Sequence, residues 1–220
     1  MWRSPVRSIL AAVALGLSAV SGAAQDRLPP WLSEEFLPAN AYGEALLGFF
    51  TTAPSPEAMA ELRERYRRSL TYTGCSLLAA WRQSQLVAPL LGRPAPPDMD
   101  ERELSQAIVD GFPLLETQLE AASLFRNADP PQEELSRYHF SLALMIAEAI
   151  RGTEHPLSGG TGYVVLTATE QYAMLEYLGV EDRGTRALVE IGGRHYDIWT
   201  TDRGRIGFDV GAFFRRSGRC

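Results

Sequence analysis

Four titratable side chains near the C-terminus are predicted to share one face of a small antiparallel sheet: Glu190, His195, Asp197 and Asp209. Glu190 is expected opposite His195, and Asp197 opposite Asp209, with Asp209 diagonal to His195 and within side-chain reach. Two facing carboxylates resist joint ionisation, while Glu190 favours the protonated form of His195. This face is therefore the place where the sequence indicates that chemistry could occur.

Cys75 could add a nucleophile to this group. If a helix restarts at Thr73-Gly74, the dipole at its N-terminus favours the thiolate of Cys75. A cysteine at the head of a helix, with His195 and Asp209 on neighbouring strands, resembles the papain-like and transglutaminase-like thiol enzymes. The resemblance covers only Gly74-Cys75, His195 and Asp209, and it implies a hydrolase or acyl transferase acting on an amide bond. It departs from those families because 120 residues, mostly helical, separate the cysteine from the histidine.

The same face supports two other interpretations. His195, Asp197 and Asp209 offer imidazole and carboxylate ligands that suit a divalent cation. Alternatively the face is simply solvated, with Arg186 and Arg205 balancing the acids, since polar outer faces are ordinary on antiparallel sheets.

A disulfide is the main competitor for Cys75. Cys75 and Cys220 are the two cysteines of the chain, and an exported protein with two cysteines commonly oxidises them. Closing a loop of this length stabilises a fold by about 4 kcal/mol in the chain-entropy model. A disulfide would remove the nucleophile.

Three predicted strands must position the acidic face. Residues 186–191 and 194–201 are joined by Gly192-Gly193, which favours a two-residue hairpin turn. Asp202-Arg203-Gly204 is predicted to be a three-residue loop leading to a strand over residues 205–210. This register points seven apolar residues inward on a single face: Ala187, Val189, Tyr196, Ile198, Ile206, Phe208 and Val210.

The front half is predicted to be helical. Asn40, Ser55 and Asp100 can each cap a helix that starts just after them. The second of these helices either continues through to residue 91 or breaks and restarts with Thr73 as its cap. A long helix is predicted over residues 132–151, and the proline-rich residues 93–98 are predicted to be a linker.

A basic run lies on the helix after Ser55. Arg65 and Arg68 each follow a glutamate by four residues, so we interpret the run, which also includes Arg63 and Arg67, as a solvated face.

After residue 152 the pattern changes. Residues 154–162 are predicted to be a flexible loop, residues 163–166 a short strand, and Thr167 to Glu170 a capping box that opens a helix ended by Gly179. The predicted fold is therefore α+β, with a helical N-terminal half packed against a C-terminal helix and a small antiparallel meander. Residues 25–152 form the helical region and residues 153–220 the α+β region of one compact domain.

Residues 1–24 have the zones of an export signal. Arg3 and Arg7 supply positive charge, residues 9–20 form an apolar run, and Ala23 and Ala24 suit a signal peptidase. The run has 12 residues, whereas spanning a bilayer takes about 20, so we expect cleavage and no membrane span afterwards. The sequence therefore predicts that the protein is periplasmic or secreted.

The composition and net charge argue against two further classes of function. All 21 basic residues are arginine, which excludes Schiff-base chemistry on lysine, and removal of the signal would lower the net charge from −6 to −8. That sign argues against nucleic-acid binding. We predict a soluble envelope protein without a cofactor, acting as a non-catalytic binding or accessory factor for an envelope protein or a cell-wall ligand. The alternative is the thiol hydrolase or acyl transferase that uses Cys75, His195 and Asp209.

Overall fold

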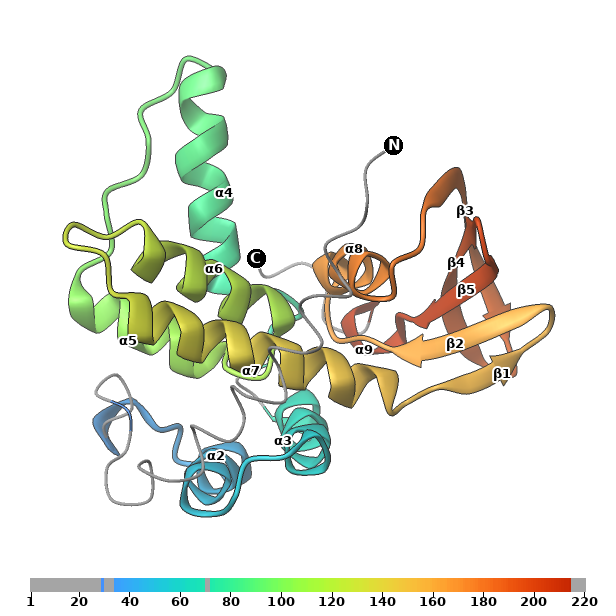
Figure 1. Cartoon of the computed structure of the whole chain (residues 1–220), viewed down its shortest axis with the longest axis horizontal. Coiled ribbons are helices and arrows are strands. Elements are labelled where there is room, and N and C mark those ends of the chain that lie inside the picture. Colours follow the sequence, from blue (N-terminus) through green and yellow to red (C-terminus); the bar gives the residue numbers. More distant parts are fainter. Residues whose placement is uncertain (1–28, 30–33, 70–71, 215–220) are drawn as a thin grey trace.

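The computed structural model describes residue 29 and residues 34–69 and 72–214 (Figure 1). The predicted export signal and Cys220 lie outside the described residues. The helices are η1 (Glu34–Phe36), α2 (Ala41–Thr51), α3 (Pro56–Arg68), α4 (Leu77–Leu90), α5 (Glu101–Asp110), α6 (Leu115–Arg126), α7 (Glu133–Arg151), α8 (Ala168–Tyr177) and α9 (Gly211–Phe214). The strands are β1 (His155–Leu157), β2 (Gly160–Val164), β3 (Asp182–Ile191), β4 (Arg194–Thr201) and β5 (Gly204–Asp209).

The predicted α+β class is confirmed. Figure 1 shows the helices of the N-terminal half at one side of the molecule and the sheet at the other. α7 packs against both α3 and α6, α2 packs against α3, and α8 contacts α6. Buried apolar residues from these helices and from β4 and β5 form a single core cluster.

The predicted helix starts are confirmed at three caps. The Asn40 side chain accepts hydrogen bonds from the first turn of α2, and the Ser55 side chain does the same for α3, which has Pro56 at its start. Asp100 and Glu103 form a reciprocal capping box on α5. Each cap satisfies backbone N–H groups that a helix leaves without partners, which is why these sequence signals are local and readable.

The sheet is larger than the predicted meander. It has five strands in the order β1-β2-β5-β4-β3, and β2 pairs in parallel with β5. The segment over residues 154–162, predicted to be a flexible loop, mostly forms the β1–β2 hairpin. Its glycines permit close packing rather than flexibility, because a Cβ on Gly162 would lie 2.5 Å from Nε2 of His155 on the neighbouring strand.

The register is confirmed for one hairpin and wrong for the other. Ala187 pairs with Ile198 as predicted, but Asp197 pairs with Phe208 rather than with Asp209. The turn has two residues instead of three, since Thr201 already pairs with Gly204. The Thr201 hydroxyl donates to the Gly204 carbonyl at 2.8 Å and accepts from the amide of Arg203 at 3.2 Å, which closes the shorter turn.

The one-residue difference distributes the apolar side chains over both faces of the sheet. Trp199 pairs with Ile206, and both belong to the core cluster shared with the helices, as does Phe208. Tyr196 and Ile198 are buried on the other face, where a Cβ on Gly207 would collide with side chains of Leu157 and Ile198. The prediction of one inward face is therefore wrong, and Ala187 is exposed.

Candidate functional site

The structure does not bring Asp209 to His195 and Asp197. Asp209 pairs across the strands with Tyr196, and because neighbouring residues of a strand point to opposite faces, it lies on the face away from His195 and Asp197. Its Oδ1 accepts a hydrogen bond from the amide of Gly211 at 3.0 Å, and its Oδ2 lies 3.6 Å from Nη1 of Arg194. Asp209 thus holds the start of α9 instead of orienting an imidazole.

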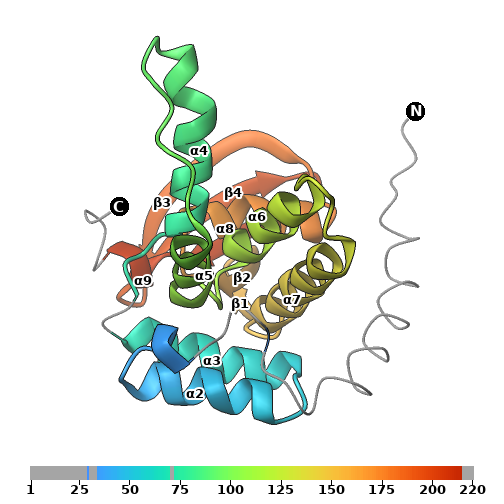
Figure 2. The same cartoon turned by 90° about the vertical axis from the view of Figure 1, so that its left-hand side faces the viewer.

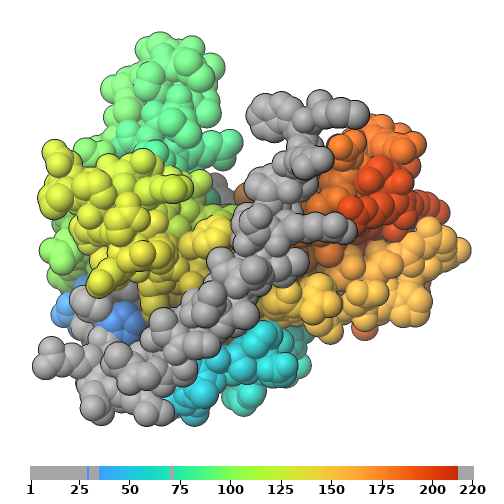
Figure 3. Space-filling view, in the orientation of Figure 1, coloured from blue at the N-terminus to red at the C-terminus, as the bar shows by residue number. Residues whose placement is uncertain are grey.

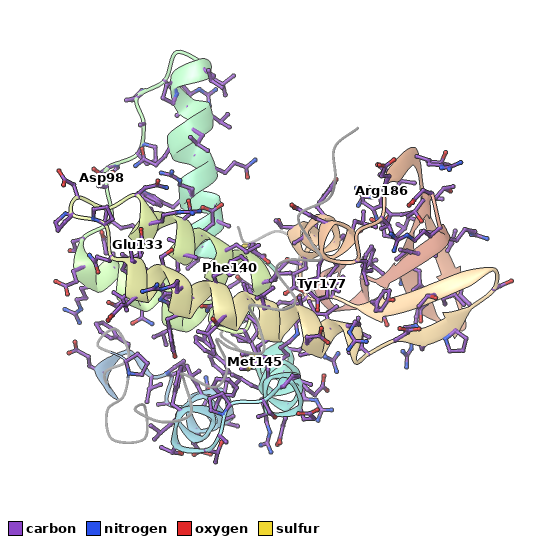
Figure 4. All side chains as sticks on the ribbon, in the orientation of Figure 1. Asp98, Glu133, Phe140, Met145, Tyr177 and Arg186 are labelled. Carbon is purple, nitrogen blue, oxygen red and sulfur yellow. The ribbon has the colours of Figure 1, made fainter. Side chains whose placement is uncertain are left out.

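Asp197 is buried against an arginine rather than open to solvent. Nε of Arg186 donates to its Oδ2 at 2.7 Å, and Nη2 donates to the same oxygen. The Arg186 guanidinium lies 4.8 Å from the ring centroid of Trp199 and donates to the hydroxyl of Tyr172 at 3.1 Å. Figure 4 labels Arg186 on the sheet. The ion pair and the two rings fasten β3 and β4 to α8.

His195 and Glu190 do lie opposite each other, as predicted. Nε2 of His195 is 3.9 Å from Oε2 of Glu190, and their side chains are 48% and 64% exposed. An exposed pair at this distance is worth little energetically. Within the described ranges, no three histidine, cysteine, aspartate or glutamate side chains are grouped so that they could hold a metal ion, so the predicted ligands His195, Asp197 and Asp209 do not converge.

Cys75 lies before α4 and not in its first turn. The cap of α4 is Ser76, whose Oγ accepts from the amide of Ala79 at 3.1 Å, so the prediction of Thr73 as the cap is wrong. Thr73 Oγ1 instead lies 3.7 Å from Cys75 Sγ. The part of the chain that the structure describes contains no free cysteine.

A buried ionic cluster, made of Arg63, Glu116 and Glu170, joins three helices. Nη1 and Nη2 of Arg63 donate to the two carboxylate oxygens of Glu170 at 2.7 and 2.9 Å. Arg63 also donates to the carbonyl of Pro113 at 2.6 Å, and Glu170 accepts from the amide of Leu166 at 2.7 Å. The cluster therefore connects α3, the turn before α6, and the start of α8. Only the capping role of Glu170 could have been noticed from sequence.

Glu116 is the unusual member of the buried ionic cluster. Burial and the negative charge of Glu170 raise its pKa to about 8, against smaller opposing effects of Thr167 and Arg63. Its carboxyl is therefore mainly protonated at neutral pH. Groups with such pKa values occur in active sites, but Arg63, Glu116 and Glu170 are only 6%, 4% and 0% exposed. No substrate reaches side chains buried to this degree, so the cluster is a structural anchor.

The most distinctive exposed feature is an arm, which we define as α4 together with the returning residues 91–100. Figures 1 and 2 both show the arm extending away from the other helices. At its base Leu78 is fully buried, and Ser76 Oγ lies 2.6 Å from Oγ1 of Thr117 on α6. Helix α4 also contacts α5. The arm is thus anchored at one end only.

The returning segment braces the helix of the arm. Nε1 of Trp81 donates to the carbonyl of Pro97 at 3.0 Å, and Nε2 of Gln85 donates to the carbonyl of Pro96 at 2.7 Å. Gln85 also contacts Asp98, which Figure 4 labels. Gly92, at a φ of 67°, makes the turn at the tip. The proline-rich residues 93–98, predicted to be a linker, therefore run alongside α4 and are held to it by these hydrogen bonds.

Large apolar side chains remain uncovered near the tip of the arm. Leu86, Leu90 and Leu91 are 62%, 84% and 63% exposed, and Val87 is also exposed. Figure 3 shows this part of the chain as a knob that rises above the rest of the visible surface. The sequence predicted the helix and the linker but not the exposure, because exposure depends on where α5 and α6 end.

No protein-family model matches the chain, and comparison with curated proteins and with solved structures finds no match either. Among the described residues, no helix is both long enough and apolar enough to cross a membrane.

Proposed function

We propose that this chain is exported to the bacterial envelope and acts there without catalysis, as a binding or accessory factor whose binding element is the arm. The observation that carries the proposal is the exposed apolar tip on a braced support. Clustered apolar residues of this size on a protein surface commonly mark an interaction site. Leu90 and Leu86 lie four residues apart and so occupy neighbouring positions on one side of the helix.

The non-catalytic assignment is supported by the separation of Asp209 from His195 on opposite faces of the sheet. Without Asp209, the histidine lacks the orienting group that the thiol-enzyme alternative requires. The position of Cys75 ahead of the Ser76 cap also weakens that alternative, because the dipole acts mainly within the first turn.

Export is supported by the charge, apolar and small-residue zones of residues 1–24. We further propose a disulfide between Cys75 and Cys220, since the described residues include no free cysteine. The loop that carries Cys75 lies near the segment between β2 and α8, because the Tyr72 hydroxyl donates to the carbonyl of Leu166. Six residues lead from Phe214 to Cys220, and six extended residues reach about 20 Å.

The binding role is tested in bacterial cells that make the chain with its own signal. A photo-crosslinking amino acid replaces Leu90 in one variant and Glu134, an exposed residue of α7, in a control. We expect adducts from position 90 and none from position 134. The same amino acid is also placed at Leu86. If neither position 90 nor position 86 gives adducts, the assignment of the arm as the binding element is overturned.

Export and the disulfide are tested on the same material. The purified protein should begin at Ala24 or Gln25, and it should show no titratable thiol when denatured without reductant. A retained Met1, or two titratable thiols, would contradict the respective proposals.

A further inference from the structure

The exposed apolar side of the arm faces away from its own brace. Trp81 and Gln85 bond the returning segment, whereas Leu86 and Leu90 follow Gln85 by one and by five residues. At 100° per residue, both leucines lie on the opposite half of the helix from Trp81 and Gln85. The brace therefore holds the tip in place without covering its apolar side.

The size of the tip limits what can bind it. A stable interface between proteins commonly uses about 20–30 residues on each side. The tip offers four large exposed apolar residues at the end of a narrow projection. A single thin projection of this kind is better suited to entering the interfacial zone of a lipid bilayer, where the gain grows with the buried apolar area and with the attraction to anionic lipids, and where no complementary partner surface is needed.

The charge distribution favours the same occupant. The whole chain has a formal net charge of −6, and the two acids of the arm, Asp98 and Asp100, follow the tip at the end of its returning segment, Asp98 with Oδ1 3.3 Å from Nε2 of Gln85. The stretch from Leu77 to Pro97, which includes the tip, contains no acidic residue. Its two charged residues are arginines: Arg82, with Nε 4.0 Å from Oε2 of Glu120, and Arg93, at the tip. A basic residue beside an apolar insertion is attracted to anionic headgroups, and the attraction is screened by salt.

We propose that the tip of the arm, with Leu86, Leu90 and Leu91 as the inserting residues and Arg93 beside them, docks on an anionic bilayer surface. This inference rests on the proposed function, in which the arm is the binding element, and it names the surface bound. The rest of the acidic protein is then held away from the membrane by the length of α4, about 21 Å for 14 residues.

The test uses the purified mature chain and flotation with vesicles of two compositions, zwitterionic lipid alone and a mixture with anionic phosphatidylglycerol. We expect binding to the mixed vesicles that weakens with added salt. Replacing Leu90 by Ser should weaken binding roughly tenfold, because a buried leucine contributes about that factor. The matched control is Leu188→Ser on β3, a leucine 54% exposed on the body, which should bind as the original chain does.

A Leu90→Trp variant provides a second readout. Its additional fluorescence should be quenched by lipids brominated on the acyl chains when mixed vesicles are added. The inference is overturned if the Leu90→Ser variant binds the vesicles as well as the original chain does, or if the original chain binds both vesicle types equally. It is also overturned if the original chain is a dimer and the Leu90→Ser variant is a monomer. Adducts to a protein from position 90 without vesicle binding would overturn the lipid surface but leave the proposed function standing, whereas absence of both would overturn the two together.

Discussion

Replacing Glu116 by Gln should remove much of the pH dependence of the free energy of unfolding in the neutral range. Glu116 is buried beside Glu170, and none of the described residues hydrogen-bonds its Oε2. Burial raises its pKa from the ordinary 4.5 to about 8. Glutamine preserves the shape of the protonated acid without a titrating proton.

The sign and size of the effect follow from these two pKa values. Between pH 4.5 and about 8 the folded state keeps a proton that the unfolded chain has released, so the free energy of unfolding falls as the pH rises. The stabilisation is complete below pH 4.5 and is lost as the pH rises through about 8. The separation of the two values corresponds to about 5 kcal/mol across the window.

The assay is urea unfolding followed by tryptophan fluorescence at about pH 5 and about pH 8, at constant ionic strength. The original chain should lose several kcal/mol between the two conditions, and Glu116→Gln should lose far less, becoming the more stable protein at the higher pH. The control is Glu61→Gln, whose side chain is 70% exposed. Parallel pH curves for the original chain and Glu116→Gln would refute the reasoning.

Three further outcomes are expected. Phe208→Ala should cost about 3–5 kcal/mol of unfolding free energy in urea because Phe208 is fully buried, whereas Asp209→Asn should cost much less; equal losses would contradict the placement of Phe208 in the core and of Asp209 outside it. Arg63→Met should cost about 3–5 kcal/mol by leaving Glu170 buried without its partner, and adding Glu170→Gln should restore part of the loss in the same assay, because the neutral side chain can still accept a hydrogen bond from the amide of Leu166. Burial lowers the pKa of His139 from 6.5 to about 3. The free energy of unfolding that this group contributes above pH 6.5 should therefore be lost as the pH falls toward 3, and His139→Gln should reduce this loss.

The parts of the fold that the sequence predicted depend on short-range chemistry. Ser55 and Asp100 satisfy amides within three residues of themselves, and the turn at Gly192-Gly193 requires the positive φ of 59° and 74° that both glycines have. Each signal acts on its own neighbours along the chain, so it can be recognised without knowing the tertiary structure.

The basic run on α3 shows where such reasoning stops. Arg65 and Arg68 pair with glutamates four residues earlier, as predicted. Arg63 belongs to the same run but is buried, and its partner Glu170 lies 107 residues further along the chain. Helical spacing identifies neighbours on α3, whereas it contains no information on which side of α3 meets α8.

The prediction of the candidate site depended on a difference of one residue in the register between β4 and β5. Whether Gly204 belongs to the turn or to β5 changes the β4–β5 register by one residue, and one residue exchanges the faces of the sheet. Both the three-residue and the two-residue turn are compatible with a glycine of φ 116°. The hydrogen bond from the Thr201 hydroxyl to the Gly204 carbonyl favours the two-residue turn, because it closes that turn. Asp209 thereby lies on the face away from His195, and Phe208 shares the core face with Trp199 instead of with Ile198. The same hydrogen bond that completes the apolar core therefore separates the residues that a catalytic or metal site would have required.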